Sequence, residues 1–257
     1  MTTRPCPEPG ARRGCPAVVV RRGAWLAAAW LAATGLLLVC GRAVVASPAV
    51  TGLDRGITTW VVDHRSSALD AAMTALTWTG SWLAAAGLVL VLAALAALRR
   101  LPVLAVATVL VGWLGALAAV SLVKAVVRRP RPPDAVRLVQ THGWAFPSGH
   151  TANAVVVFST AAVLACLVLR SARARWAVRA VAAAAVLLIA FSRVELGAHW
   201  ATDVAASVVW TTAWLVPVVT VLPGLPVRRG PGRAADSPSG AAEPATTSGP
   251  VQSPSTS

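Results

Sequence analysis

Apolar residues gather along the chain in six long runs that short polar stretches separate. A helix needs about 20 apolar residues to cross the hydrocarbon core of a bilayer. The runs occupy residues 24–45, 71–98, 101–127, 151–169, 176–191 and 203–222. The fifth is short, but Trp176 can anchor one interface and the helix can continue a turn past Phe191. The pattern predicts an all-α integral membrane bundle of six transmembrane helices.

The two ends of the chain differ from this membrane domain, which we place at residues 17–222. Residues 1–16 are rich in Pro, Gly and Arg and predict a disordered N-terminal tail. Residues 223–257 turn to Pro, Gly, Ser, Thr and Ala and predict a disordered C-terminal tail. The first run also resembles a signal peptide, with Val-Val-Ala-Ser at residues 44–47. Its apolar stretch is longer than signal peptides usually have, so we expect a retained helix.

Composition supports a membrane protein and excludes an ordinary soluble domain. The 257 residues are 56% hydrophobic and 12% charged, whereas soluble domains carry about 25% charged residues. The net charge of +14 does not indicate a nucleic-acid partner, because the arginines lie at the ends of apolar runs. The four cysteines show no metal-ligand spacing and no disulfide framework.

The basic residues predict how the bundle sits in the membrane, because cytoplasmic loops hold the excess of Lys and Arg. With the N-terminus inside, 14 of the 23 basic residues are cytoplasmic. They are Arg4, Arg12, Arg13, Arg21, Arg22, Arg99, Arg100, Arg170, Arg173, Arg175, Arg179, Arg228, Arg229 and Arg233. Both termini are then cytoplasmic in a multi-pass cell-membrane protein. The main exception is the outward segment 124–137, whose five basic residues need another reason for their charge.

Three outward segments hold nearly all the candidate chemistry. The first extends from Lys124 through Arg131 to Pro132, at the end of the third run. The second is Pro-Ser-Gly-His at 147–150, opening the fourth run, and the third extends from Ser192 to Asp203. Since all three lie at the same membrane face, helix packing can bring them together.

The residue types fit a site for a phosphate ester. Lys124, Arg131 and Arg193 supply three cations for an anion of about −1.5 to −2. Ser148 and Gly149 precede a helix, whose N-terminal N–H groups and dipole favour an anion. They would complete an oxyanion cage.

The histidines can supply the reaction. Asp203 lies four residues after His199, so its carboxylate can orient that imidazole for nucleophilic attack. His150 can protonate the leaving oxygen. No acidic cluster of the kind that holds catalytic magnesium accompanies them, so we expect no metal and no cofactor.

Each of these residues has an ordinary structural interpretation when taken alone. A lone histidine near a helix end is most often an interfacial residue, and Lys124 can be a snorkelling helix end. Several further residues are possible helpers that we interpret as solvated loop residues. They are Glu195, Arg128, Arg129, Arg137, His64 and His142. The joint pattern carries the prediction.

That joint pattern, Lys-x6-Arg-Pro, Pro-Ser-Gly-His and Ser-Arg-x5-His-x3-Asp, resembles the three-part signature of the type 2 phosphatidic acid phosphatase and haloperoxidase superfamily. The six-run layout resembles its membrane-bound lipid phosphatases. The resemblance implies a role for each matching residue: His199 as nucleophile, Asp203 as its partner, His150 as acid, and Lys124, Arg131, Ser148, Gly149 and Arg193 as phosphate ligands. Lys124 is the only lysine of the chain, and it stands at the signature position.

The implied function is that of a metal-independent phosphatase acting on a lipid phosphate or lipid diphosphate at the extracytoplasmic face, through a phosphohistidine. A lipid phosphotransferase that uses the same intermediate remains open. A non-catalytic lipid-binding or transport protein is the alternative from another class, although such a protein would be expected to lose His199 or His150 first. A soluble haloperoxidase would not carry membrane-length runs. The sequence leaves the lipid and the oligomeric state open.

Overall fold

The computed structural model of the chain describes residues 16–101 and 103–220, and every element within them is a helix. In chain order these are α1 (Pro16–Ala46), α2 (Pro48–Asp63), α3 (Ser67–Thr77), the short 3-10 helix η2 (Trp78–Gly80), α4 (Trp82–Ala97), α5 (Val103–Val127), the 3-10 helix η3 (Asp134–Val136), α6 (Gly149–Val168), α7 (Ala172–Glu195) and α8 (Ala201–Val219). Apart from Pro16, which begins α1, the two predicted tails lie outside the described residues.

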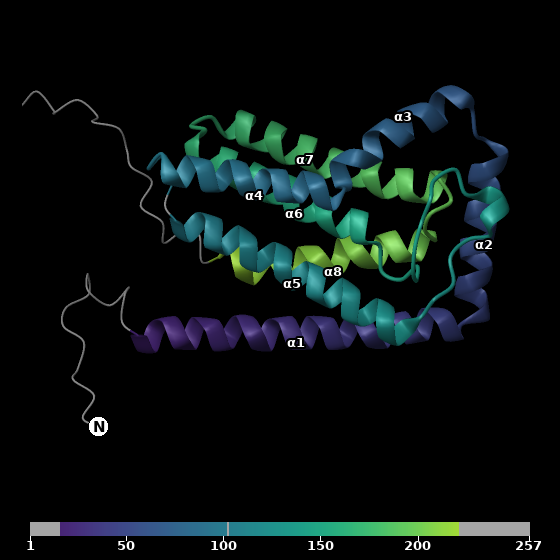
Figure 1. Cartoon of the computed structure of the whole chain (residues 1–257), viewed down its shortest axis with the longest axis horizontal. Helices are drawn as coiled ribbons and strands as arrows, with labels where there is room; N and C mark the ends of the chain where they lie inside the picture. The colour runs from purple at the N-terminus through teal and green to yellow at the C-terminus, as the bar shows by residue number, and fades with distance from the viewer. Residues whose placement is uncertain (1–15, 102, 221–257) are drawn as a thin grey trace, which may run out of the picture. The chain divides into compact units, whose positions relative to one another are not determined.

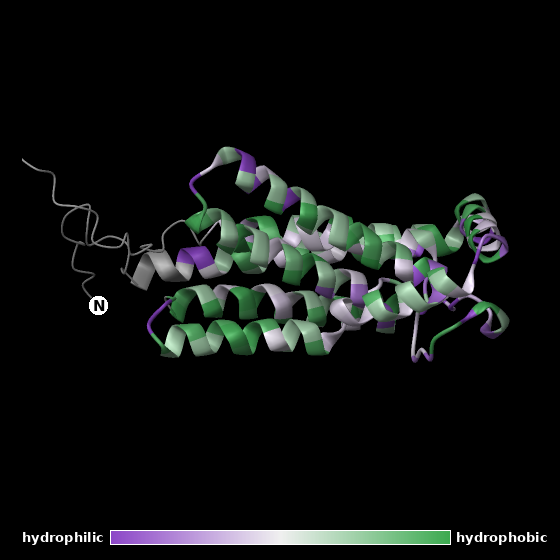
Figure 2. Cartoon of the chain, turned by 90° about the horizontal axis from the view of Figure 1, so that it is seen from above, coloured by the Kyte–Doolittle hydropathy of each residue, from purple (hydrophilic) through white to green (hydrophobic). Residues whose placement is uncertain are grey.

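The predicted membrane bundle is confirmed. Five of the described helices are long and apolar enough to cross a membrane, and a sixth span results when α3, η2 and α4 are taken together. In Figure 1 the long helices α1, α4, α5, α6, α7 and α8 lie lengthwise beside one another. Apolar residues cover most of their length, and polar residues gather toward the helix ends (Figure 2).

The second predicted run is not one continuous helix. It is broken at residues 78–81, where the two halves meet at 44°. Ser81 ends the break by accepting a hydrogen bond from the N–H of Ala84. Gly80 lies so close to α6 that an added Cβ would be 3.0 Å from the carbonyl oxygen of His150. The break therefore lets the chain pack tightly against the start of α6.

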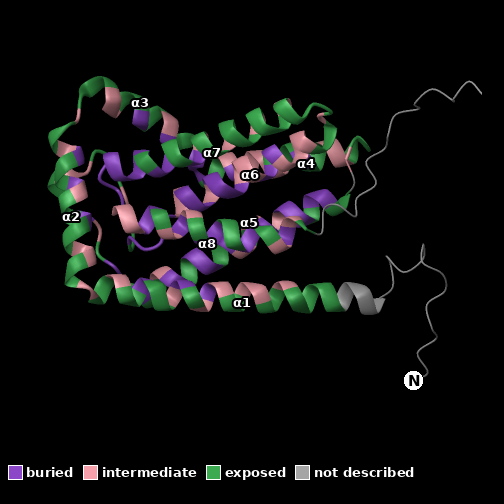
Figure 3. Cartoon of the chain, turned by 180° about the vertical axis from the view of Figure 1, so that it is seen from behind, coloured by how far each residue is buried: buried purple, intermediate pink, exposed green. Residues whose placement is uncertain are grey.

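Helix α2 is an element that the apolar runs did not predict. It lies across one end of the long helices (Figures 1 and 3) and contacts α7 and α8. Ser47 caps its first turn through a hydrogen bond from the N–H of Val50. Its buried face consists of Asp54, Thr58 and Val61. Two of these three residues are polar, so a search for apolar runs passes over the helix.

The main apolar core lies along the middle of the bundle, between α1, α5, α6, α7 and α8 (Figure 3). Small residues on α5 let tryptophans approach closely. Trp214 donates from Nε1 to the carbonyl oxygen of Gly112 at 2.9 Å, and Trp30 donates to that of Gly115 at 2.8 Å. Close packing over small residues is how membrane helices associate when water does not drive them together.

Candidate active site

The three predicted segments meet at the end of the bundle that carries α2. The end of α5 leads into residues 128–148, a stretch that crosses this end of the bundle before α6 begins (Figure 1). The turn between α7 and α8 lies against it, because the N–H of Leu138 donates to the carbonyl oxygen of Leu196. Gly197 in that turn has φ +66°, and an added Cβ would meet the carbonyl oxygen of Val136. This position requires glycine for both its conformation and its close approach.

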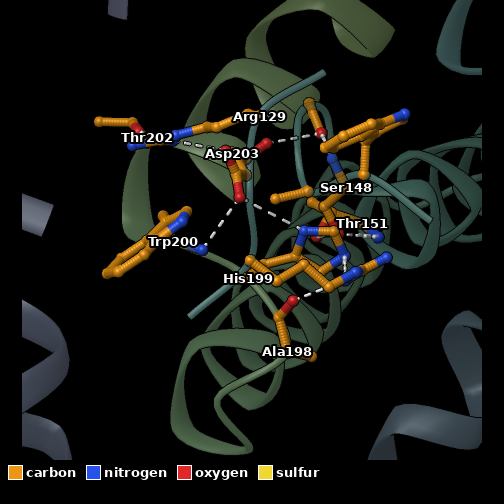
Figure 4. Close-up of polar contacts among 12 residues, drawn as sticks. Arg129, Ser148, Thr151, Ala198, His199, Trp200, Thr202 and Asp203 are labelled. Atoms are coloured by element: carbon orange, nitrogen blue, oxygen red, sulfur yellow. Dashed lines mark hydrogen bonds and ion pairs between the residues drawn. The ribbon is translucent and has the colours of Figure 1, made fainter. Parts of the chain in front are cut away.

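His199 is held just before α8 rather than within it. Its N–H donates to the carbonyl oxygen of Arg193 at 3.0 Å, which fixes the turn from α7. Asp203 lies in the first turn of α8, where its Oδ2 accepts a hydrogen bond from the N–H of Trp200 at 3.0 Å. Nδ1 of His199 is 3.4 Å from this same Oδ2, and both side chains are buried (Figure 4). The predicted pair forms even though α8 begins two residues after His199.

The other ring nitrogen of His199 faces Arg131, one of the predicted cations. Nη1 of Arg131 lies 3.3 Å from Nε2. A guanidinium can only donate, so Nε2 must be the acceptor and the proton must reside on Nδ1, on the side of Asp203. This tautomer leaves a lone pair on Nε2, which is the form that a nucleophilic imidazole needs.

The surroundings of His199 also keep it neutral. Burial lowers the pKa of the imidazole well below its ordinary value, and the positive charges of Lys124, Arg131, Arg193 and His150 lower it further. These four groups come from α5, the following loop, α7 and α6. Burial likewise lowers the pKa of Arg131, but a guanidinium remains charged at neutral pH.

Backbone carbonyl groups orient two of the cations. Lys124 donates from Nζ to the carbonyl oxygens of Trp144 and Ala145, at 2.5 and 3.3 Å. Arg131 donates to the carbonyl oxygens of Gly143, His142 and Ala198. The stretch 142–145 therefore aims both side chains from one side of the site.

Arg193 approaches from α7. Its Nη1 donates to Oγ1 of Thr77 at 2.7 Å, so the broken second span supplies a support for the cage. Its Nε is buried and has no hydrogen-bond partner among the described residues. Buried guanidinium N–H groups are costly to leave unpaired, and an anionic oxygen would satisfy this one.

The Pro-Ser-Gly-His segment leads into α6, which begins at Gly149, two residues before the predicted apolar run. Ser148 is the N-cap, and its Oγ accepts hydrogen bonds from the N–H and the hydroxyl of Thr151. The N–H of Ser148 donates to Oγ of Ser207 at 2.7 Å, so it is already paired. The N–H groups of Gly149 and His150 lie in the first turn, where a helix has no acceptor of its own. These two, rather than that of Ser148, remain for an anion.

Two residues that we interpreted as solvated are in fact buried. Arg129 is 3% exposed and forms ion pairs of 2.5 Å with both Asp54 and Asp203. Glu195 is fully buried, with Arg65 at 3.7 Å. Their partners lie more than 70 positions away along the chain, so no local pattern could reveal them. Asp54 and Arg65 were missed altogether.

The other residues that we considered as possible contributors to the site have their side chains outside the group of cations around His199. Arg128 and His142 are exposed, and exposed His64 stacks on Trp60. Arg137 pairs with Asp134 and donates to Thr141. Within the described residues no group of three or more His, Cys, Asp or Glu side chains could hold a metal ion.

Comparison with known proteins gives one family. Residues 103–225 match the model of the PAP2 superfamily, a range that contains all three segments of the site. No curated protein matches this chain significantly.

Two solved structures are similar to the chain. A transmembrane PAP2-type phosphatidylglycerolphosphate phosphatase from Bacillus subtilis is 24% identical, with a TM-score of 0.67 over 74% of this chain and 94% of that protein. LpxE from Aquifex aeolicus is 21% identical, with a TM-score of 0.51 over 65% of this chain and 95% of that protein. At these identities the likeness shows a shared helical membrane fold.

Proposed function

Because residues 103–225 belong to the PAP2 superfamily, we propose that the chain is a lipid phosphatase that works through a phosphohistidine on His199. The observation that carries this proposal is the orientation of one imidazole. Nδ1 of His199 faces the carboxylate of Asp203, and Nε2 faces Arg131. A nucleophile is thus aimed into a group of cations, as phosphoryl transfer requires.

In the first step the lone pair on Nε2 attacks phosphorus. The bond from phosphorus to the lipid oxygen breaks, and that oxygen takes a proton from His150 acting as general acid. The imidazole becomes positively charged as the N–P bond forms. Asp203 stabilises this charge through Nδ1–H, and Lys124, Arg131 and Arg193 stabilise the phosphoryl oxygens.

In the second step His150, now neutral, takes a proton from water, and the resulting hydroxide oxygen attacks phosphorus. The N–P bond breaks, its electron pair returns to Nε2, and inorganic phosphate leaves. His199 and His150 are then in their starting protonation states. The first turn of α6 contributes the N–H groups of Gly149 and His150 to the cage, while Ser148 fixes where that helix begins.

The charges of the cage support a metal-independent reaction. Three cationic side chains repel a divalent metal and supply the charge stabilisation that a metal gives in other phosphatases. We therefore propose that activity persists when metals are chelated.

We propose that the substrate is a membrane lipid carrying a phosphate monoester or a diphosphate. The Bacillus subtilis relative is described as acting on phosphatidylglycerolphosphate, which is a lipid phosphate. A membrane-embedded bundle whose polar site lies at the end of its apolar helices suits a substrate with its tail in the bilayer and its phosphate at the surface.

The arginine distribution supports an extracytoplasmic site. We propose that Arg100 and Arg175 lie in the cytoplasm and that the loop bearing Asp134 lies outside. A membrane-impermeant thiol reagent should label Asp134→Cys in intact cells, and it should label Arg175→Cys only after lysis, in a chain whose native cysteines are replaced. The opposite labelling would reverse the proposed orientation.

The activity itself is tested by phosphate release from purified protein in detergent. The panel contains phosphatidate, phosphatidylglycerolphosphate, a prenyl monophosphate and a polyprenyl diphosphate, each with and without a chelator. Release from at least one lipid, unchanged by the chelator and absent from the His199→Ala variant, is expected. Equal release by His199→Ala would contradict the covalent mechanism.

A further inference from the structure

A row of three buried charges connects the site to α2. Arg129 donates from Nη1 to Oδ1 of Asp203 and from Nη2 to Oδ2 of Asp54, both at 2.5 Å. Thr202 bridges Arg129 and Asp54, because it accepts from Nη1 of Arg129 and donates from its N–H and its hydroxyl to Asp54. The indole of Trp200 lies 5.6 Å from the guanidinium carbon (Figure 4). These contacts fix the guanidinium on several sides.

The two oxygens of the Asp203 carboxylate have different partners. Arg129 holds Oδ1, while Oδ2 accepts from the N–H of Trp200 and faces Nδ1 of His199. A carboxylate fixed at Oδ1 cannot rotate, so Oδ2 stays directed at the imidazole. The forked guanidinium can hold two carboxylates at once in this way, whereas an ammonium cannot keep the same planar geometry.

The charges also matter, because Asp203 is fully buried. A buried carboxyl group without a cation tends to bind a proton, and it would then stop stabilising a positive imidazole. Arg129 alone would keep Asp203 ionised, but the ion pair of the two residues would have no net charge and would stabilise a positive imidazole less. Asp54 offsets that second effect, since the row of two carboxylates and one guanidinium keeps a net charge of −1.

We propose that Arg129 and Asp54 are positioning residues for the hydrolysis, with Arg129 orienting the carboxylate of Asp203 and Asp54 preserving the negative charge that His199 needs. This inference rests on the proposed function of His199. It assigns a role to α2, the helix that supplies Asp54. Neither residue contacts the substrate in this scheme, so both act on the rate of the chemical step.

The decisive variant is Asp54→Asn, which keeps the size of the side chain and removes one negative charge. We expect kcat to fall by about 10- to 100-fold, the usual loss when an outer partner of a site is removed, with KM nearly unchanged. The charged groups that face His199 are Lys124, Arg131, Arg193, His150 and Asp203. Removing Asp54 leaves the cations in excess, so protonation of His199 becomes harder.

The acid limb of kcat/KM should therefore move to lower pH while the plateau falls. A purely structural defect would reduce the amount of active enzyme and leave the shape of the pH profile unchanged. A profile for Asp54→Asn that superimposes on the native one after scaling would overturn the proposal.

The neighbouring arginines provide a matched pair of variants. Arg129→Lys keeps the charge and loses the fork, so a fall in kcat of about 10- to 100-fold is expected. Arg128→Lys makes the same exchange at an exposed position and should retain native kcat. Equal activity of the two variants would also overturn the proposal. The His199→Ala variant keeps the tests apart: if it is inactive while Asp54→Asn and Arg129→Lys behave as native, only the positioning role fails.

Discussion

The end of the bundle that carries α2 and the middle of the bundle are stabilised in different ways. At the end that carries α2, buried apolar residues are joined by a group of buried charged and polar side chains that includes Asp54, Arg129, Arg193, His199 and Asp203. In the middle of the bundle the buried side chains are mainly alanine, valine, leucine and tryptophan, and large apolar side chains also cover the outside. Specific directional contacts thus define one region, and close packing defines the other.

The two regions should therefore accept different kinds of substitution. A packed apolar core tolerates exchanges that conserve volume and loses stability gradually. A buried polar network fails when one partner is removed, because the remaining groups cannot find another partner. Substitutions at the polar end should therefore reduce activity, and substitutions in the middle should reduce stability.

The largest effect is expected from the nucleophile and its partner. His199→Ala should reduce kcat on the order of 10⁴-fold or more, the scale seen when a covalent nucleophile is lost. Asp203→Asn should cost up to about 10⁴-fold, because the imidazole loses its orienting carboxylate. Phosphate release under substrate saturation measures both. Asp134→Asn, at an exposed carboxylate of the adjoining loop, is the matched control and should keep native activity.

A smaller loss, which depends on the substrate, is expected from His150→Ala. General acid catalysis contributes about 10² to 10⁴ in rate, and the need for it grows with the basicity of the leaving oxygen. A lipid alkoxide leaves poorly, whereas a lipid phosphate leaving from a diphosphate is far less basic. The variant should lose more activity on a monophosphate than on a diphosphate with the same lipid chain. An equal loss on both would make His150 a phosphate ligand rather than the acid.

The pH dependence of activity that arises from protonation of His199 is expected to be a still smaller effect. Burial and the surrounding cations lower the pKa of this imidazole, so it should remain neutral when the pH falls through its ordinary value of about 6.5. Protonation removes the lone pair, and a lowered pKa moves that loss to lower pH. The chain has four histidines, so NMR of histidine-labelled protein can assign each by single substitution. A midpoint for His199 near 6.5 would contradict the described surroundings.

The smallest effect on activity is expected in the apolar core. Leu215 is buried and packs against Gly112 of α5. Leu215→Ala should reduce the free energy of unfolding by about 2–5 kcal/mol through lost contacts and a cavity, and should leave kcat per folded molecule unchanged. Thermal unfolding followed beside phosphate release separates the two quantities. A fall in kcat as large as that of Asp54→Asn would remove the distinction between the two regions.

The sequence predicts the apolar region well. Runs of apolar residues mark helices directly, since a bilayer leaves few other ways to satisfy the backbone. The three site segments could also be placed at one end, because successive spans alternate in direction. The break at residues 78–81 could not be predicted from apolarity, because it depends on the contact of Gly80 with α6 and α7.

The buried polar network was the part that the sequence could not reveal. Arg129 resembles its exposed neighbour Arg128 in the sequence, and only the distant Asp54 and Asp203 distinguish the two positions. Helix α2 has a buried face that is mostly polar, so it lacks the signal that marks the other helices. The sequence offers one weak signal, which is that Asp54 lies on the same helix face as Thr58 and Val61. In the structure this face is buried and turned toward the site.

The most direct test of the central claim is to trap the phosphoenzyme. His150→Ala should slow the attack of water on the phosphohistidine more than the departure of a lipid phosphate. This variant should therefore accumulate the intermediate when it is mixed with a lipid diphosphate. Rapid quenching at alkaline pH, proteolysis and mass spectrometry would locate the modification. We predict a phosphoryl group on His199 that is absent when His199→Ala is combined with the same variant. Turnover of the lipid without any modification of His199, or with the phosphoryl group on another residue, would contradict the account.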